Sequence, residues 1–216
     1  MGVITDNVGL YADGLLGTLK ICGLAAVAAL LLGIVLAAFR VSPVAPLRAT
    51  GTAYITLVRN CPLTIVLFFF AFGLPEVGIN GAYFSFGVAG LAVYTAAFVC
   101  EAVRSGIGAV DAGQVEAARA IGLTFGQSLR LIVLPQAVRA VIPPLGNVVI
   151  AMIKNSAILG AFGVGGELYS VANTLNSARG EPALPVYTGV VIGYLIIIIP
   201  AGLLLRILEK RMTVTR

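Results

Sequence analysis

Six polar or charged side chains interrupt stretches of sequence that are otherwise almost entirely apolar. A charge placed in hydrocarbon costs a few kcal/mol on insertion scales, so such residues are candidates for binding a solute or an ion. Two of them, Arg59 and Lys154, lie too far from the ends of their apolar stretches to reach water easily, and neither has a charge partner nearby in sequence. The six candidates are Arg59, Glu101, Asn147, Lys154, Asn155 and Ser156.

Two of these residues also have purely structural interpretations. Glu101 and Arg104 are three residues apart, which on a helix favours an ion pair near the end of a span. Asn147 follows Pro143 and Pro144 and could cross-link neighbouring helices by a hydrogen bond. Both interpretations stay open beside the functional one.

Metal and covalent chemistry find little support in the sequence. It has no histidine, and its three cysteines, Cys22, Cys61 and Cys100, are far apart and lie in or beside apolar runs. Neither a metal site nor a disulfide framework is expected from that spacing. No catalytic residue is predicted.

The composition points to lipid as the main solvent of this chain. Of its 216 residues 59% are hydrophobic and 11% are charged, whereas soluble domains average about 25% charged residues. The net charge of +5 would favour nucleic acid in a soluble protein. In a membrane protein it is better explained by basic residues that gather on the cytoplasmic side, so no nucleic-acid partner is expected.

Uncharged runs long enough to cross a bilayer predict an all-α integral membrane protein with five transmembrane helices. The chain is expected to form one domain, residues 1–216, and the prolines of the fourth span predict a kink. Residues 163–185 are expected to form a loop, with Gly163, Gly165 and Gly166 in a flexible turn. The predicted spans cover residues 15–39, 50–74, 82–104, 138–162 and 186–208.

Charge decides the predicted orientation, because five spans put the two termini on opposite sides. With the N-terminus outside, ten cations fall on the inner side and only Lys20 and Arg179 lie near the outer one. The C-terminus is then cytoplasmic. The ten inner cations are Arg40, Arg48, Arg104, Arg119, Arg130, Arg139, Arg206, Lys210, Arg211 and Arg216.

Residues 101–139 hold seven charges, too many for a segment that lies in lipid. Within them, residues 113–135 predict a pair of short helices between spans three and four. Gly122 suits the end of the first helix, and Thr124 with Gln127 has the form of a capping box that starts a second helix running to Pro135. Its apolar residues share one helical face; they are Phe125, Leu129, Ile132 and Val133. A helix pair that lies on the membrane surface is the alternative.

The spacing of seven residues in this segment resembles a known motif. They are Glu116, Ala117, Ala118, Gly122, Ile132, Leu134 and Pro135. The pattern is similar to the cytoplasmic EAA loop of permease subunits in binding-protein-dependent ABC importers. That resemblance implies the type I ABC importer permease fold, with the segment acting as a coupling-helix pair that docks on an ATPase subunit. The implied coupling residues are Glu116, Ala117, Ala118, Arg119, Gly122 and Leu123, although Glu116 and Arg119 could instead simply pair with each other.

The resemblance covers nearly the whole chain and narrows the substrate class. The stretch YITLVRNCPLTIVLFFFAFGLP, which begins at Tyr54, looks like polar amino acid uptake permeases, and VRNCPLT looks most like those for glutamate. Family members often carry Asp in the position of Asn155, so this chain has one negative charge fewer at that position, which favours an acidic solute over a basic one. We therefore expect Arg59 and Lys154, with Asn155 and Ser156, to line a cavity where a cation meets the carboxylate of an acidic or amide amino acid.

The same resemblance implies the partners and the energy source. They are two copies of an ABC ATPase, a second copy of this chain or a similar permease, an extracellular amino acid binding protein and the lipid of the bacterial cell membrane. The chain has no G-x-x-x-x-G-K-[ST] motif, so ATP and Mg²⁺ are expected in the ATPase and no cofactor in this chain. A small ion-coupled secondary carrier and a scaffold that only anchors a partner are the alternatives.

Overall fold

The structure is a computed structural model that describes residues 2–212, so the predicted inner cation Arg216 lies outside the described residues. Within that range it contains helices and no strand. The α-helices are α1 (Gly2–Asp6), α2 (Val8–Val41), α3 (Ala45–Asn60), α4 (Leu63–Phe68), α5 (Leu74–Glu76), α6 (Tyr83–Gly108), α7 (Ala112–Ala120), α8 (Phe125–Ser128), α9 (Leu134–Asn155), α10 (Ala157–Ala161), α11 (Leu168–Asn173) and α12 (Ala183–Met212). Three π-helical turns separate some of them: η1 (Phe69–Gly73), η2 (Leu129–Val133) and η3 (Thr174–Ala178).

Long apolar helices confirm the predicted all-α membrane class. Four helical stretches within residues 2–212 are long and apolar enough to cross a bilayer: Val8–Val41, Tyr83–Gly108, Phe125–Ala161 and Ala183–Arg211. The pair Ala45–Asn60 and Leu63–Glu76 makes a fifth if its two bent halves count as one span.

The second apolar stretch is bent sharply rather than straight. Its two helices meet at an angle of 105°. Pro62 has no N–H to donate, and the residue before a proline avoids helical backbone angles; Cys61 accordingly has φ −95° and ψ 134°. Pro62 indicated an interruption in the sequence, but the sequence does not predict the size of the bend.

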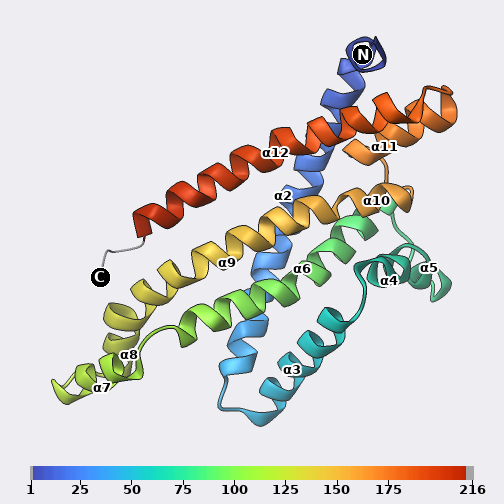
Figure 1. The fold of residues 1–216 in the computed structure, drawn as a ribbon. Coiled ribbons are helices and arrows are strands. Elements are labelled where there is room, and N and C mark those ends of the chain that lie inside the picture. Colours follow the sequence, from blue (N-terminus) through green and yellow to red (C-terminus); the bar gives the residue numbers. More distant parts are fainter. Residues whose placement is uncertain (1, 213–216) are drawn as a thin grey trace.

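The core lies where α2, α6 and α9 meet (Figure 1). Small and aliphatic side chains of α2 and α6 are fully buried there, among them Ala25, Leu91 and Ala96. The helix α12 covers this core along one side and is tied to α2 by the Tyr11 hydroxyl, which donates to the Val186 carbonyl at 3.0 Å. Most of α12 stays exposed, as expected for a helix that faces lipid.

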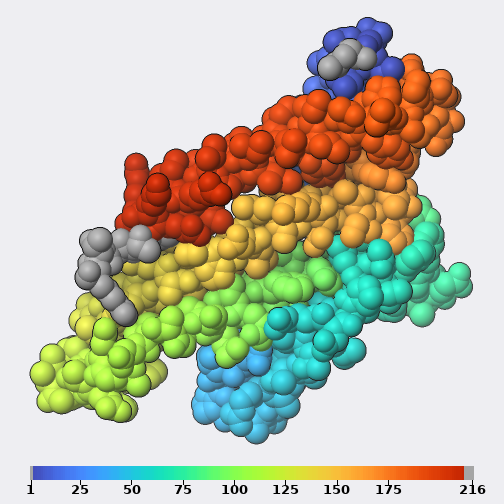
Figure 2. All heavy atoms as spheres, in the orientation of Figure 1, coloured from blue at the N-terminus to red at the C-terminus, as the bar shows by residue number. Residues whose placement is uncertain are grey.

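The short helices gather at the two ends of the bundle (Figure 1). At one end lie α4, α5, α10 and α11, and at the other end lie α7 and α8. The space-filling view shows α7 and α8, in yellow-green, projecting as a separate tip (Figure 2). We call residues 112–128 the coupling tip.

Two sequence expectations about helix limits were wrong. Residues 163–185 are not simply a loop, because α11 and η3 form within them. Glu167 caps α11 by accepting from the backbone N–H groups of Tyr169 and Ser170, a role more often filled by Ser, Thr, Asp or Asn. Gly163, Gly165 and Gly166 do form the expected turn, with φ between 72° and 79°.

The second helix of the coupling segment also does not stop at Pro135. It passes from α8 through η2 directly into α9, with Pro135 in the first turn of α9. Because helical residues precede Pro135, its missing N–H leaves a carbonyl of the preceding turn without its usual helical partner. The wider π-helical turn precedes it, and the result is one continuous helical stretch, Phe125–Ala161.

Candidate functional site

The coupling tip has the local structure that its sequence predicts. Gly122 adopts φ +87°, which favours glycine, and the N–H of Leu123 donates to the Ala118 carbonyl, so α7 ends as expected. The Thr124 hydroxyl accepts from the N–H of Gln127, and the Gln127 side chain accepts from the N–H of Thr124, which completes the capping box.

The tip presents apolar side chains to its surroundings. Ile121 is 79% exposed and Phe125 is 72% exposed. Phe125 therefore points away from the protein, unlike Ile132 and Val133, which are half-buried. Large apolar side chains exposed together at a projecting tip are typical of a surface that binds another protein.

The charged residues of the tip are free to meet a partner. Glu116, Ala117 and Arg119 are exposed, and Ala118 is buried against the rest of the segment. Among the ion pairs of the described chain, none joins Glu116 to Arg119. The local pairing considered from the sequence is therefore not made within residues 2–212.

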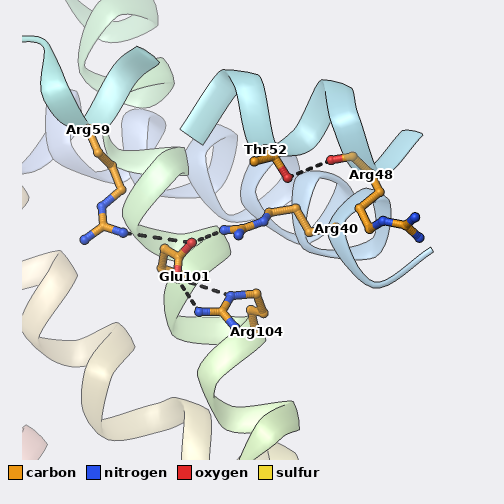
Figure 3. A network of polar contacts seen from close by, with 6 residues as sticks. All are labelled: Arg40, Arg48, Thr52, Arg59, Glu101 and Arg104. Carbon is orange, nitrogen blue, oxygen red and sulfur yellow. Dashed lines mark hydrogen bonds and ion pairs between the residues drawn. The ribbon is translucent and has the colours of Figure 1, made fainter. Parts of the chain in front are cut away.

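Glu101 lies at the centre of a cluster of three arginines (Figure 3). One of its carboxylate oxygens, Oε1, bonds Arg40 of α2 and lies 3.9 Å from Nη1 of Arg59 on α3. The other, Oε2, accepts from Nη2 of Arg104 at 2.9 Å and from its Nε at 3.3 Å. The expected Glu101–Arg104 pair is present, but it is one part of a junction between three helices.

The junction holds more positive than negative charge. Three guanidinium groups share one carboxylate, so the cluster carries a formal charge of +2. Gly51 of α3 leaves room for the Arg40 side chain, because a Cβ atom at residue 51 would lie only 2.9 Å from Cγ of Arg40. Arg59 is held most loosely, because its contact with Glu101 is the longest of the three.

A cavity of about 370 Å³ opens between α6 and α9, close to Arg59. The Arg59 guanidinium lies 5.6 Å from the centre of the Phe98 ring, which is within the range of a cation–π contact, and Phe98 lines the cavity. The other lining residues are Tyr94, Thr95, Asn147, Val148, Ala151, Met152 and Asn155.

The structure brings some predicted site residues together and separates others. Asn147 and Asn155 line the cavity, and Arg59 stands at its Phe98 edge. Lys154 is exposed and does not line this cavity. Ser156 is fully buried and donates to the Ile153 carbonyl at 2.7 Å, so its hydroxyl serves the helix rather than the cavity.

Sequence reasoning missed most residues of this region, among them three on α6 and one on α2. Tyr94, Thr95 and Phe98 line the cavity, but they occur in an uncharged run and carry no local signal that separates them from lipid-facing residues. Arg40 was counted only as an inner cation, and its bond to a glutamate 61 residues away could not be read from spacing.

A fully buried acid lies at the other end of the bundle. Glu167 is fully buried, and its carboxylate accepts from the N–H of Tyr169 at 2.5 Å and from that of Ser170 at 2.8 Å. Burial raises the pKa of Glu167 to about 7, and the two backbone hydrogen bonds lower it only in part. Within the described range no three His, Cys, Asp or Glu side chains come together as a metal site would need.

Comparison with known proteins shows the family of this chain. The profile of the family described as "Binding-protein-dependent transport system inner membrane component" matches residues 29–214. The chain is 40% identical over 212 residues to a probable glutamine ABC transporter permease protein, GlnM, of Bacillus subtilis, covering 98% of this chain and 97% of that protein. It is also 40% identical over 211 residues to the glutamate transport system permease protein GluC of Corynebacterium glutamicum, covering 92% of each.

Solved structures agree with the fold. The chain is similar to a crystal structure of an amino acid ABC transporter with histidines, with a TM-score of 0.92, 33% identity and 97% of both chains covered. An inward-facing structure of the MetNI methionine ABC transporter matches with a TM-score of 0.78 and 22% identity, over 97% of this chain and 99% of that one. At that identity the second match speaks for the fold alone.

Proposed function

Because the chain belongs to the family of binding-protein-dependent transport system inner membrane components, we propose that it is the membrane-spanning permease subunit of an ATP-driven importer for glutamate or glutamine. Its role as a transport subunit of an amino acid ABC importer follows from relatives that match nearly its whole length. The single observation that carries the proposal is the coupling tip, which holds the Glu-Ala-Ala run in a projecting, exposed helix. The chain itself contributes no catalytic step.

An ATPase and a binding protein are the partners that this family implies. The exposed Ile121 and Phe125 suit a groove on the ATPase, and Glu116 beside them offers a negative charge to a basic surface. We propose two ATPase copies, which bind ATP and Mg²⁺, and a second permease that is either another copy of this chain or a similar protein.

The cavity supports an acidic or amide amino acid as the solute. Its volume of about 370 Å³ is ample for one amino acid, and the amides of Asn147 and Asn155 can donate to a carboxylate or pair with a carboxamide. The Arg59 guanidinium can form a bidentate contact with a carboxylate, and the +2 charge of its cluster favours an anion over a cation. Lys154 remains part of the proposed path only as a cation near the cavity.

We propose that transport proceeds by alternating access. Closure of the ATPase dimer would move the coupling tip, and the helix that carries Asn147 and Asn155 continues from that tip. A shift of this helix relative to α6 changes which end of the cavity is open. The excess of basic residues on one side supports an N-terminus outside and a cytoplasmic C-terminus in the bacterial membrane.

An ion-coupled carrier is not favoured, because the relatives that cover nearly the whole chain are ABC permeases. Purification of the chain with its native ATPase and binding protein tests the proposal directly. In lipid nanodiscs, ATP hydrolysis should rise several-fold when the binding protein carries glutamate or glutamine, and should not rise with lysine or arginine. Stimulation by lysine or arginine alone would overturn the proposed substrate class.

A further inference from the structure

Two glutamine side chains join α7, the first helix of the coupling tip, to α9. The Nε2 atom of Gln136 donates to Oε1 of Gln114 at 2.5 Å and to the Ile132 carbonyl at 2.9 Å. Gln114 lies in the first turn of α7, and Gln136 lies in the first turn of α9. Both donor positions of the Gln136 amide are therefore used, one toward each element.

Little else fastens α7 at this point. Ala118 is the only buried residue of α7, and a methyl group buries little apolar surface. Among the side-chain hydrogen bonds of the described residues, the Gln114–Gln136 bond is the one between α7 and the α8–α9 helix. The turn at Gly122 connects the two elements covalently, but a single turn leaves the angle between them free to change.

The helix that carries Gln136 also carries residues of the cavity. Asn147 and Asn155 line that cavity and lie further along the same helix. The distance from Gln136 to Asn155 along the axis is about 28 Å at the helical rise of 1.5 Å per residue. Pro143 and Pro144 lie between Gln136 and the cavity residues, but α9 stays one continuous helix across them, so a displacement applied at Gln136 is passed on toward the cavity.

We propose that Gln114 and Gln136 form a clamp that makes α7 and α9 move as one body, so that movement of the coupling tip repositions the cavity residues. They are positioning residues, because they do not contact the solute. The inference rests on the proposed function, in which an ATPase moves the tip. Without the clamp, the angle between α7 and the α8–α9 helix can change when the ATPase moves the tip, so less of the movement reaches the cavity and more ATP is hydrolysed for each amino acid imported.

Two double variants test the clamp, one that keeps the donor–acceptor pair and one that breaks it. Gln114→Glu with Gln136→Lys keeps an acceptor facing a donor, whereas Gln114→Lys with Gln136→Lys places two donors against each other. Asp111→Ala serves as a control, since it removes the N-cap of α7, where Oδ1 of Asp111 accepts from the N–H of Gly113 at 2.7 Å, without touching the clamp.

Each variant is reconstituted in liposomes with the ATPase and the binding protein, and the ATP hydrolysed per amino acid imported is measured. We expect the Lys/Lys variant to raise this ratio about fivefold or more, while the Glu/Lys variant and Asp111→Ala stay near the wild-type value. Recovery of the ATPase with each variant, measured by co-purification, should not change.

The outcomes separate the inference from the proposed function. A wild-type ratio in the Lys/Lys variant would overturn the clamp and leave the proposed function standing. An equal rise in Asp111→Ala would also overturn it, because the effect would then come from helix stability. A wild-type complex that hydrolyses ATP and imports nothing would overturn the proposed function and the clamp together.

Discussion

The guanidinium group of Arg59 lies 5.6 Å from the centre of the Phe98 ring. This contact joins two otherwise separate features, since Phe98 lines the cavity between α6 and α9 and Arg59 belongs to the arginine cluster around Glu101. A half-exposed cation is thereby held beside a largely apolar cavity. Arg40 and Arg104 bind Glu101 more closely than Arg59 does, so Arg59 is the member of the cluster best able to meet a solute.

Replacement of Arg59 by alanine should therefore lower the initial rate of uptake about tenfold or more, because a charge-assisted hydrogen bond to the solute is lost. Arg59→Lys should retain part of the activity, since it keeps the charge and loses the bidentate geometry. Arg48→Ala is the matched control, as Arg48 is an exposed arginine of the same helix that neither lines the cavity nor pairs with Glu101. Uptake by Arg59→Ala at the wild-type rate would remove Arg59 from the solute path.

Glu101→Gln should destabilise the protein, because three arginines lose their shared counter-charge at once. These side chains keep 19% to 47% exposure, so we expect a loss of about 2 kcal/mol rather than the 3–5 kcal/mol of a fully buried pair. The melting temperature in detergent should fall by about 5 °C. Glu76 is an exposed acid of α5, so Glu76→Gln should leave the melting temperature unchanged. An equal melting temperature for Glu101→Gln and Glu76→Gln would contradict the stabilising role of Glu101.

Glu167 should make stability depend on pH in a defined direction. Its pKa rises from the ordinary 4.5 to about 7 on folding, so between these values the folded protein holds more protons than the unfolded chain. The stability that Glu167 contributes is then fully present below about pH 4.5 and is lost as the pH rises through 7. The sequence has no histidine to obscure this trend.

The measurement is the melting temperature of wild type and Glu167→Gln at intervals from pH 5 to pH 8. The wild-type value should decline over this interval, while the variant, which cannot titrate at that site, should change much less. Parallel curves for the two proteins would show that burial of Glu167 does not set the pH dependence.

Phe125→Ala should weaken binding of the ATPase, because truncation of a central aromatic residue typically costs about 2 kcal/mol or more at an interface, which is more than tenfold in Kd. Leu184 is an equally exposed apolar residue at the start of α12, with 81% exposure, so Leu184→Ala controls for a general loss of apolar surface. The amount of ATPase that co-purifies with each variant, at increasing concentrations of salt or detergent, would compare how strongly the two variants bind it. Equal recovery with both variants would argue against docking through the tip.

Much of the fold follows from local patterns that a sequence displays. The uncharged run at residues 186–208 predicts a helix because a bilayer requires about twenty apolar residues, and α12 includes all of it. The end of α7 at Gly122 and the start of α8 at Thr124 were predictable because caps depend on neighbours within a few residues.

Other features depend on residues far apart and left no local signal. The Arg40–Glu101 bond and the Gln114–Gln136 bond each join separate helices, so neither follows from periodicity. The helix α11 was missed because a buried glutamate caps it, a residue type that rarely indicates a helix start. Lys154 and Ser156 were grouped with Asn155 by adjacency, although successive residues on a helix point about 100° apart.

The most direct test of this account compares the chain in liposomes with and without an ATPase partner. With the ATPase, ATP and the binding protein present, glutamate or glutamine should accumulate against its gradient, and accumulation should stop when the ATPase is omitted or ATP is absent. Accumulation by the isolated chain, driven by an ion gradient alone, would contradict the account.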